Sequence, residues 1–178
     1  LPSLVGGSVK VFAAESTGPI KSKLHPRLST SAKWLWMVYV ILTIACILSY
    51  KACGMGWFDA FNYSMTSTAT GGFATESGSI MAFHSPAEEY VCTLFCFLSG
   101  VNFTLLYTSV AGFKLKKLFR NSEFRFYTTL VASFTIFIML ELIFRRSYDV
   151  EHAFRSSVFQ VVSFITTTGL FSDDAAQW

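Results

Sequence analysis

Charged residues are scarce in this sequence. Asp, Glu, Lys and Arg make up 14% of the 178 residues, whereas a soluble domain averages about 25%. A surface with so few charges need not face water everywhere, which argues against an ordinary soluble domain. The net charge of +3 is too small to indicate a nucleic-acid partner, and we expect none.

Metal ligands and catalytic motifs are also sparse. The three histidines are scattered, and although Cys92 and Cys96 share a helix face, no histidine or further thiol completes a metal set. We therefore interpret the thiols as small buried apolar groups. The sequence contains neither His-Glu-x-x-His nor Gly-x-Ser-x-Gly, which weakens the alternative of a membrane-embedded enzyme built on Glu88, Glu89 or His84.

Long apolar runs are abundant, by contrast. They cover residues 34–50, about 90–113 and about 124–144, and 52% of the whole chain is hydrophobic. The shortest run has 17 residues and would rise roughly 25 Å as an α-helix, near the lower limit for crossing a bilayer core. Three such helices are hard to bury in a soluble protein of this length, so we interpret them as membrane-spanning helices.

The charges between these runs predict a topology. Segments 1–33 and 114–125 are basic, whereas segments 51–89 and 145–178 carry most of the acidic residues. Short basic loops stay in the cytoplasm, so we expect the basic segments inside and the acidic ones outside. The acidic segments would raise the local concentration of cations arriving from outside.

An internal repeat links the apolar runs. Residues 57–68 form a shorter apolar segment that would cover roughly 18 Å as a helix, about half a bilayer. The pattern recurs at residues 157–173, which align without gaps on residues 59–75 at an offset of 98. Both copies end in Thr-x-Thr-Gly-x-Phe, at 68–73 and 166–171. The sequence therefore predicts repeats of helix, re-entrant half-helix, loop and helix.

The two loops have the composition of a cation filter. Backbone carbonyls of short extended loops can replace the water shell of K⁺, glycine permits positive φ, and each half-helix turns its negative end to the ion. The candidate ion-binding residues are Ala69, Thr70, Gly71, Gly72, Thr167, Thr168, Gly169 and Leu170. Those expected to coordinate K⁺ directly are Thr70, Gly71, Thr168 and Gly169.

Three further polar features have structural interpretations. We expect Asn102 to take part in helix packing rather than to face a pore. We expect Ser99-Gly100 to be a close-packing site rather than a hinge, and Glu88-Glu89 to begin a helix, because acidic residues favour helix N-termini.

These motifs resemble the Trk/Ktr/HKT superfamily of potassium transporters, most closely its bacterial TrkH-type subunits. The resemblance covers essentially the whole chain and includes both filter loops, the segment 6–15 and the segment 120–125. It implies an all-α membrane protein in which four helix–pore-loop–helix repeats surround one pore. Leu170 stands where many members have a small residue or Phe, from which we expect a local side-chain adjustment and no change of ion.

The resemblance also implies an organisation of the chain. Residues 1–33 would be a cytoplasmic linker, 34–113 the second repeat and 114–123 a cytoplasmic connection. Residues 124–178 would be the first helix and pore loop of a truncated third repeat. Because the chain opens at Leu1 with no initiator Met and no basic leader, we expect it to be a fragment cut from a longer protein.

The function implied is uptake of K⁺ across the bacterial cytoplasmic (inner) membrane, with K⁺ as the transported ion, no organic cofactor and no enzymatic activity. The implied partners are membrane lipid, a second copy in a homodimer and a cytoplasmic TrkA-like nucleotide-binding regulatory subunit. The alternatives are a non-conducting membrane scaffold and the membrane-embedded enzyme considered above.

Overall fold

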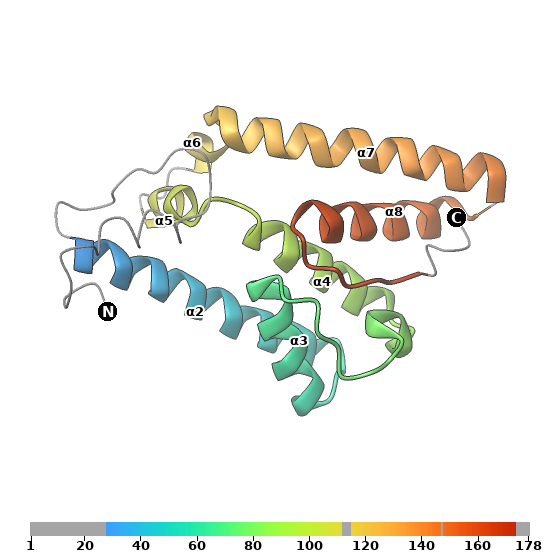
Figure 1. The fold of residues 1–178 in the computed structure, drawn as a ribbon, viewed down its shortest axis with the longest axis horizontal. Coiled ribbons are helices and arrows are strands. Elements are labelled where there is room, and N and C mark those ends of the chain that lie inside the picture. Colours follow the sequence, from blue (N-terminus) through green and yellow to red (C-terminus); the bar gives the residue numbers. More distant parts are fainter. Residues whose placement is uncertain (1–27, 112–114, 147, 174–178) are drawn as a thin grey trace. The chain divides into compact units, whose positions relative to one another are not determined.

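The computed structural model describes residues 28–111, 115–146 and 148–173, which form helices and loops without a β-strand among them. The elements in chain order are α2 (Leu28–Ala52), α3 (Trp57–Ala69), η1 (Ser79–Phe83), α4 (Pro86–Ser99), α5 (Phe103–Ala111), α6 (Leu115–Arg120), α7 (Ser122–Arg146) and α8 (Val150–Ile165) (Figure 1). This confirms the predicted all-α class. Most of the predicted linker 1–33, residue 114 of the connection and residues 174–178 lie outside the described residues.

The chain divides into two compact units. The first comprises Leu1–Ile41 and Val101–Arg125, and the second comprises Leu42–Gly100 and Phe126–Trp178. In the first unit the ring centroids of Trp34 and Tyr107 lie 5.1 Å apart, and α5 packs on α6. The second unit contains both half-helices and both predicted filter loops.

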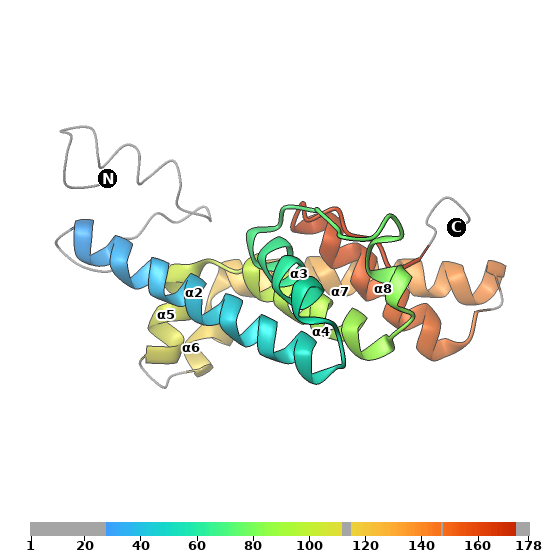
Figure 2. The ribbon, with the colours of Figure 1, turned by 90° about the horizontal axis from the view of Figure 1, so that it is seen from below.

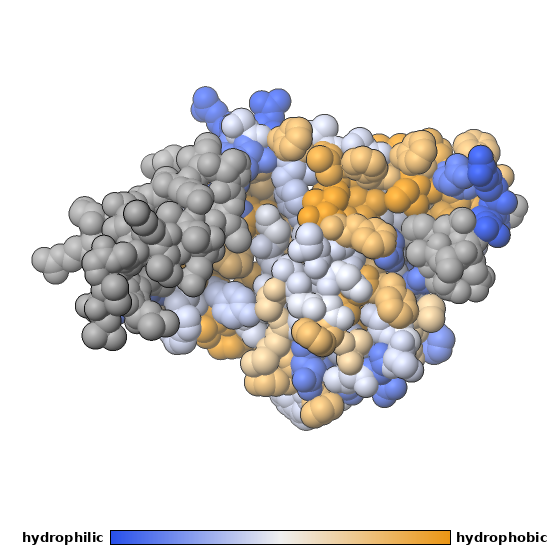
Figure 3. Space-filling model, viewed as in Figure 1, coloured by the Kyte–Doolittle hydropathy of each residue, from blue (hydrophilic) through white to orange (hydrophobic). Residues whose placement is uncertain are grey.

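Two helical stretches, Lys33–Ala52 and Ser122–Arg146, are long and apolar enough to cross a membrane. They agree with the first and third predicted spans. Along α7 the side chains of Phe126, Phe137 and Phe144 are 71%, 68% and 80% exposed, and Figure 3 shows hydrophobic residues gathered over this helix. An exposed apolar face of this kind fits contact with lipid rather than with water.

The structure corrects the second predicted span, because residues 90–113 do not form one continuous helix. Helix α4 ends at Ser99, and the backbone N–H of Gly100 donates to the carbonyl of Cys96 at 3.1 Å. Asn102 then accepts a hydrogen bond from the backbone N–H of Thr104 at 3.0 Å, just as α5 begins. Glycine and asparagine both favour helix ends, an effect that a count of apolar residues does not register.

Helix α4 forms the centre of the second unit, where it packs against α3 and α8 (Figure 1). Pro86 stands in the first turn of α4 together with Glu88 and Glu89, as predicted for a helix start. Cys92 and Cys96 are free, buried thiols in the hydrophobic core. Both thiols are therefore buried, as predicted.

Gly100 also fulfils its predicted packing role. A Cβ atom at this position would lie 2.6 Å from Tyr127 Oη and 2.7 Å from Thr166 Cγ2. Only a residue without a side chain lets α4 approach both α7 and the end of α8 so closely.

Candidate functional site

Each predicted filter loop begins where a half-helix ends. Helix α3 has 13 residues and α8 has 16, which correspond to roughly 20 and 24 Å. Asp149 caps the N-terminus of α8 by accepting a hydrogen bond from Glu151 N at 3.4 Å. Both helices present their carbonyl ends, which carry partial negative charge, to the loops that follow.

The loops turn sharply away from these helices. In the loop at 68–73, called the second-repeat loop after the predicted organisation, Thr70 has a φ of 52° and Gly72 a φ of 75°. In the loop at 166–171, called the third-repeat loop, Thr167 has 58° and Gly169 has 80°. Positive φ is uncommon outside glycine, so two threonines in this region mark tightly determined turns. The Thr70 hydroxyl donates to the carbonyl of Ala69 at 2.7 Å, which supports its turn.

The backbone register of the loops differs by one residue from the sequence repeat. The N–H of Gly71 donates to the carbonyl of Thr66 at 3.0 Å, and the N–H of Thr168 donates to the carbonyl of Ser163 at 2.8 Å. These equivalent bonds are offset by 97 residues, one fewer than the aligned motifs. As a result Gly72, rather than Gly71, adopts the positive φ that the third-repeat loop has at its single glycine.

The two loops lie side by side on one face of the second unit (Figure 2). A Cβ atom at Gly72 would collide with the carbonyl oxygen of Thr168 and would lie 3.8 Å from the Cα of Gly169. A Cβ atom at Gly169 would meet nothing within 4 Å. The fold therefore brings together residues of both predicted filter loops, and the contact is tight at Gly72 and open at Gly169.

Hydrogen bonds hold the C-terminal part of the third-repeat loop, at Leu170 and Phe171. The buried Ser163 hydroxyl donates to the carbonyl of Leu170 at 2.6 Å, and the N–H of Phe171 donates to Ser79 Oγ at 3.2 Å. The Leu170 side chain is buried in the core. Leucine at this position thus serves as a packing residue.

The second-repeat loop is fastened through different residues. The Thr75 hydroxyl donates to Asp59 Oδ1 at 2.7 Å, which ties the chain beyond the loop to the first turn of α3. Further along α3, Ser67 is hydrogen-bonded to the hydroxyl of Tyr50 on α2 at 3.0 Å. Both ends of the half-helix are therefore held.

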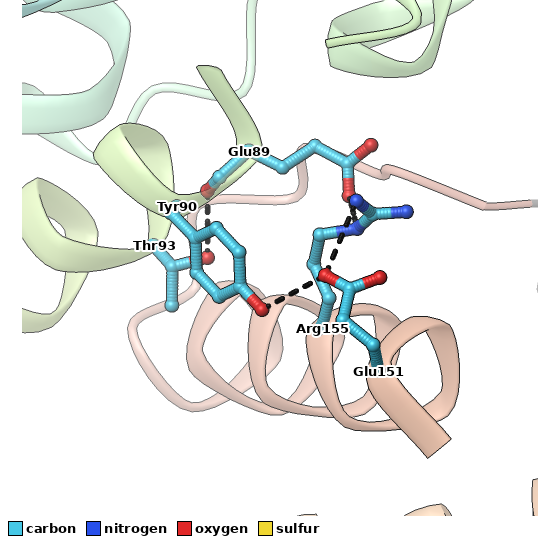
Figure 4. A network of polar contacts seen from close by, with 5 residues as sticks. All are labelled: Glu89, Tyr90, Thr93, Glu151 and Arg155. Atoms are coloured by element: carbon cyan, nitrogen blue, oxygen red, sulfur yellow. Dashed lines mark hydrogen bonds and ion pairs between the residues drawn. The ribbon is translucent and has the colours of Figure 1, made fainter. Parts of the chain in front are cut away.

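A polar network that the sequence did not reveal joins α4 to α8 (Figure 4). Arg155 Nε lies 3.1 Å from Glu89 Oε2, Arg155 Nη1 lies 3.4 Å from Glu151, and the Tyr90 hydroxyl donates to Glu151 at 3.1 Å. Burial raises the pKa of Glu89 to about 7; Arg155 opposes this rise, while Asp173 and Glu151 add to it. The only sequence signal was that Arg155 is the single basic Lys or Arg residue in the segment 150–165.

Two long apolar helices and two half-helices, each half-helix followed by a non-helical loop, are the elements of a pore-loop membrane protein of the potassium-channel type. The model of the TrkH family, described as a cation transport protein, matches residues 1–178. The chain therefore belongs to the TrkH family.

Relatives of known name agree with this assignment. The chain is 37% identical to the Trk system potassium uptake protein TrkH of Halomonas elongata and 36% identical to TrkG of Escherichia coli, and covers 37% of each. All of this chain is aligned in both comparisons, so it spans little more than a third of the length of these relatives. The crystal structure of the potassium transporter TrkH from Vibrio parahaemolyticus superimposes with a TM-score of 0.81 and 34% identity, over 87% of this chain and 34% of that one.

Proposed function

We propose that this chain forms part of a K⁺ uptake pathway and that backbone carbonyls of its two loops coordinate the ion. The observation that carries the proposal is the close approach of Gly72 to Thr168. This contact brings together two non-helical, glycine-containing loops, each of which follows the C-terminal, partially negative end of a half-helix. Non-helical backbone at membrane depth is stable only where protein buries it or where it lines a watery cavity.

The eight loop residues divide into proposed ligands and proposed wall residues, and hydrogen bonds support the wall assignment of two of them. The proposed K⁺ ligands are the carbonyls of Thr70, Gly71, Thr168 and Gly169. The proposed wall residues are Ala69, Gly72, Thr167 and Leu170. Ala69 and Leu170 belong to the wall because their carbonyls already accept hydroxyl hydrogen bonds within the protein.

The organisation of the whole protein is part of the same proposal. Residues 1–33 would form a cytoplasmic linker, 34–113 the second repeat, 114–123 a cytoplasmic connection, and 124–178 the beginning of the third repeat. The protein would reside in the bacterial cytoplasmic membrane as a homodimer with a TrkA-like regulatory subunit and without enzymatic activity. Membership of the TrkH family and the exposed apolar face of α7 support this arrangement.

The test is K⁺-dependent growth of an uptake-deficient host that expresses the full-length protein. Gly71→Asp and Gly169→Asp should abolish growth at low K⁺, because each places a bulky charged side chain at the proposed ion path. Gly54→Asp is the matched control, since Gly54 lies in a turn outside the loops, has nothing within 4 Å of an added Cβ and, like Gly169, has a positive φ, so the substitution brings a comparable backbone strain. It should leave growth intact.

Two results would overturn the proposal. If the wild-type protein reached the membrane and did not restore growth, a non-conducting scaffold or an enzyme would explain the fold better. If both aspartate variants supported growth like the wild type, the assignment of the filter would be wrong.

A further inference from the structure

One buried ion pair connects the second repeat to the third within the described residues. The side chains of Arg155 and Glu89 are only 10% and 9% exposed, and their charged atoms lie 3.1 Å apart. Other ion pairs in the described part link residues four apart on a single helix. Buried charges are strongly unfavourable unless they are paired, so the pairing stabilises both side chains in their present positions.

The Glu89–Arg155 pair lies where it can affect the position of the third-repeat loop relative to the second-repeat loop. Arg155 belongs to α8, which leads as one rigid helix to the third-repeat loop, whereas Glu89 lies in the first turn of α4, on the second repeat. The hydrogen bond from Tyr90 to Glu151 forms a second link between the same helices. A change in the Glu89–Arg155 distance would therefore shift α8 along or around α4.

We propose that the Glu89–Arg155 pair is a positioning device that holds the third-repeat filter loop in register with the second, so that the choice between K⁺ and Na⁺ depends on it. The inference rests on the proposed function of the loops. The two residues do not touch the ion; they act through α8 on the loop that Thr168 belongs to.

Selectivity is the property most sensitive to such a shift. The carbonyl of Thr168 faces the backbone of Gly72 without room for a methyl group, so a small movement of α8 changes the spacing of the proposed ligands. Discrimination between ions that differ mainly in radius depends on the spacing and number of those ligands.

The pair should also respond to pH. Burial raises the pKa of Glu89 to about 7, so the carboxylate is charged above that pH and loses its charge as the pH falls below it. The groups that act on it are Arg155 and Glu151 of α8 and Asp173 beyond the third-repeat loop. Acidification below pH 7 neutralises the Glu89 carboxylate and thereby removes the attraction within the pair.

The experiment measures uptake by the full-length protein, normalised to its amount in the membrane, in K⁺/Na⁺ competition between external pH 6 and 8. Glu89→Gln should lower the preference for K⁺ by on the order of tenfold at pH 8 and should abolish its dependence on pH. Arg155→Lys keeps the charge and loses the fork geometry of the guanidinium group. Its preference for K⁺ over Na⁺ should lie between that of the wild type and that of Arg155→Met. Glu141→Gln is the matched control, because Glu141 forms an exposed ion pair with Arg145 on α7.

The outcomes separate this inference from the proposed function. Wild-type uptake with unchanged K⁺ preference in Glu89→Gln and Arg155→Met would overturn the positioning role and leave the filter assignment standing. A loss of protein from the membrane with normal selectivity per molecule would also overturn it, since it would show a purely structural pair. If Glu89→Gln fails to accumulate, Arg155→Lys decides: reduced selectivity supports the role, and wild-type selectivity refutes it.

Discussion

Substitution of Gly100 tests how tightly α4 packs against α7 and the end of α8. The Gly100 φ of −74° suits any residue, so Gly100→Ala adds only a methyl group and no backbone strain. That methyl group would lie 2.6 Å from Tyr127 Oη and 2.7 Å from Thr166 Cγ2. Tyr127 cannot withdraw freely, because its ring stacks on Phe97 at 4.9 Å and its hydroxyl donates to the Phe97 carbonyl.

The magnitude follows from three contributions. Overpacking a well-filled site costs about 1–3 kcal/mol, and loss of the Tyr127 hydrogen bond costs about 0.5–1.5 kcal/mol. Alanine loses less backbone entropy on folding than glycine, which stabilises the variant by about 0.5–1 kcal/mol. We therefore expect Gly100→Ala to destabilise the folded protein by about 2 kcal/mol.

The assay is the thermal midpoint of the full-length protein in detergent, measured in a double-mutant cycle with Tyr127→Phe. Removing the Tyr127 hydroxyl removes the nearest obstacle to the new methyl group, so Gly100→Ala should cost about 1 kcal/mol less in that background. A Gly100→Ala variant as stable as the wild type would refute the packing argument. So would a penalty that Tyr127→Phe leaves unchanged.

Two predictions concern the loops themselves. Gly72→Ala should abolish K⁺ uptake, because its Cβ would collide with the Thr168 carbonyl, whereas Gly169→Ala should retain measurable uptake, since it adds only about 1–2 kcal/mol of left-handed backbone strain. Equal uptake rates of the two variants at equal amounts in the membrane would contradict this difference. Ser163→Ala should raise the KM for K⁺ several-fold, because it removes a buried hydrogen bond of about 1 kcal/mol that fixes the Leu170 carbonyl; an unchanged KM would show that the loop does not need this bond.

The sequence predicted those parts of the fold that depend on local composition. The half-helices were visible because a short apolar segment ended in Thr-x-Thr-Gly at 68–71 and again at 166–169. The first and third spans were visible as uninterrupted apolar runs. The break at 100–102 was not, because Gly100 and Asn102 end a helix without lowering its hydropathy much.

The missed features of the candidate site depend on distant contacts. The pairing of Glu89 with Arg155 requires α4 and α8 to be side by side, which no local pattern encodes. The one-residue shift between the loops escaped detection because an alignment matches residue types, whereas hydrogen bonds such as that from Gly71 to Thr66 set the backbone register.

A hydroxyl and a carboxylate stand at aligned positions of both repeats, but only one repeat uses them to hold its loop. In the second repeat the carboxylate of Asp59 stands on the half-helix and the hydroxyl of Thr75 beyond the loop, 2.7 Å apart. At the aligned positions of the third repeat the half-helix carries the hydroxyl of Ser157 and the chain beyond the loop carries the carboxylate of Asp173. One donor and one acceptor are thus present in each copy, although neither position is identical. The hydroxyl of Ser157 makes no hydrogen bond within the described residues, so the aligned residues do not reproduce the contact. The second-repeat loop is held by Thr75 and Asp59, whereas the third-repeat loop is held by Ser163 and the Leu170 carbonyl.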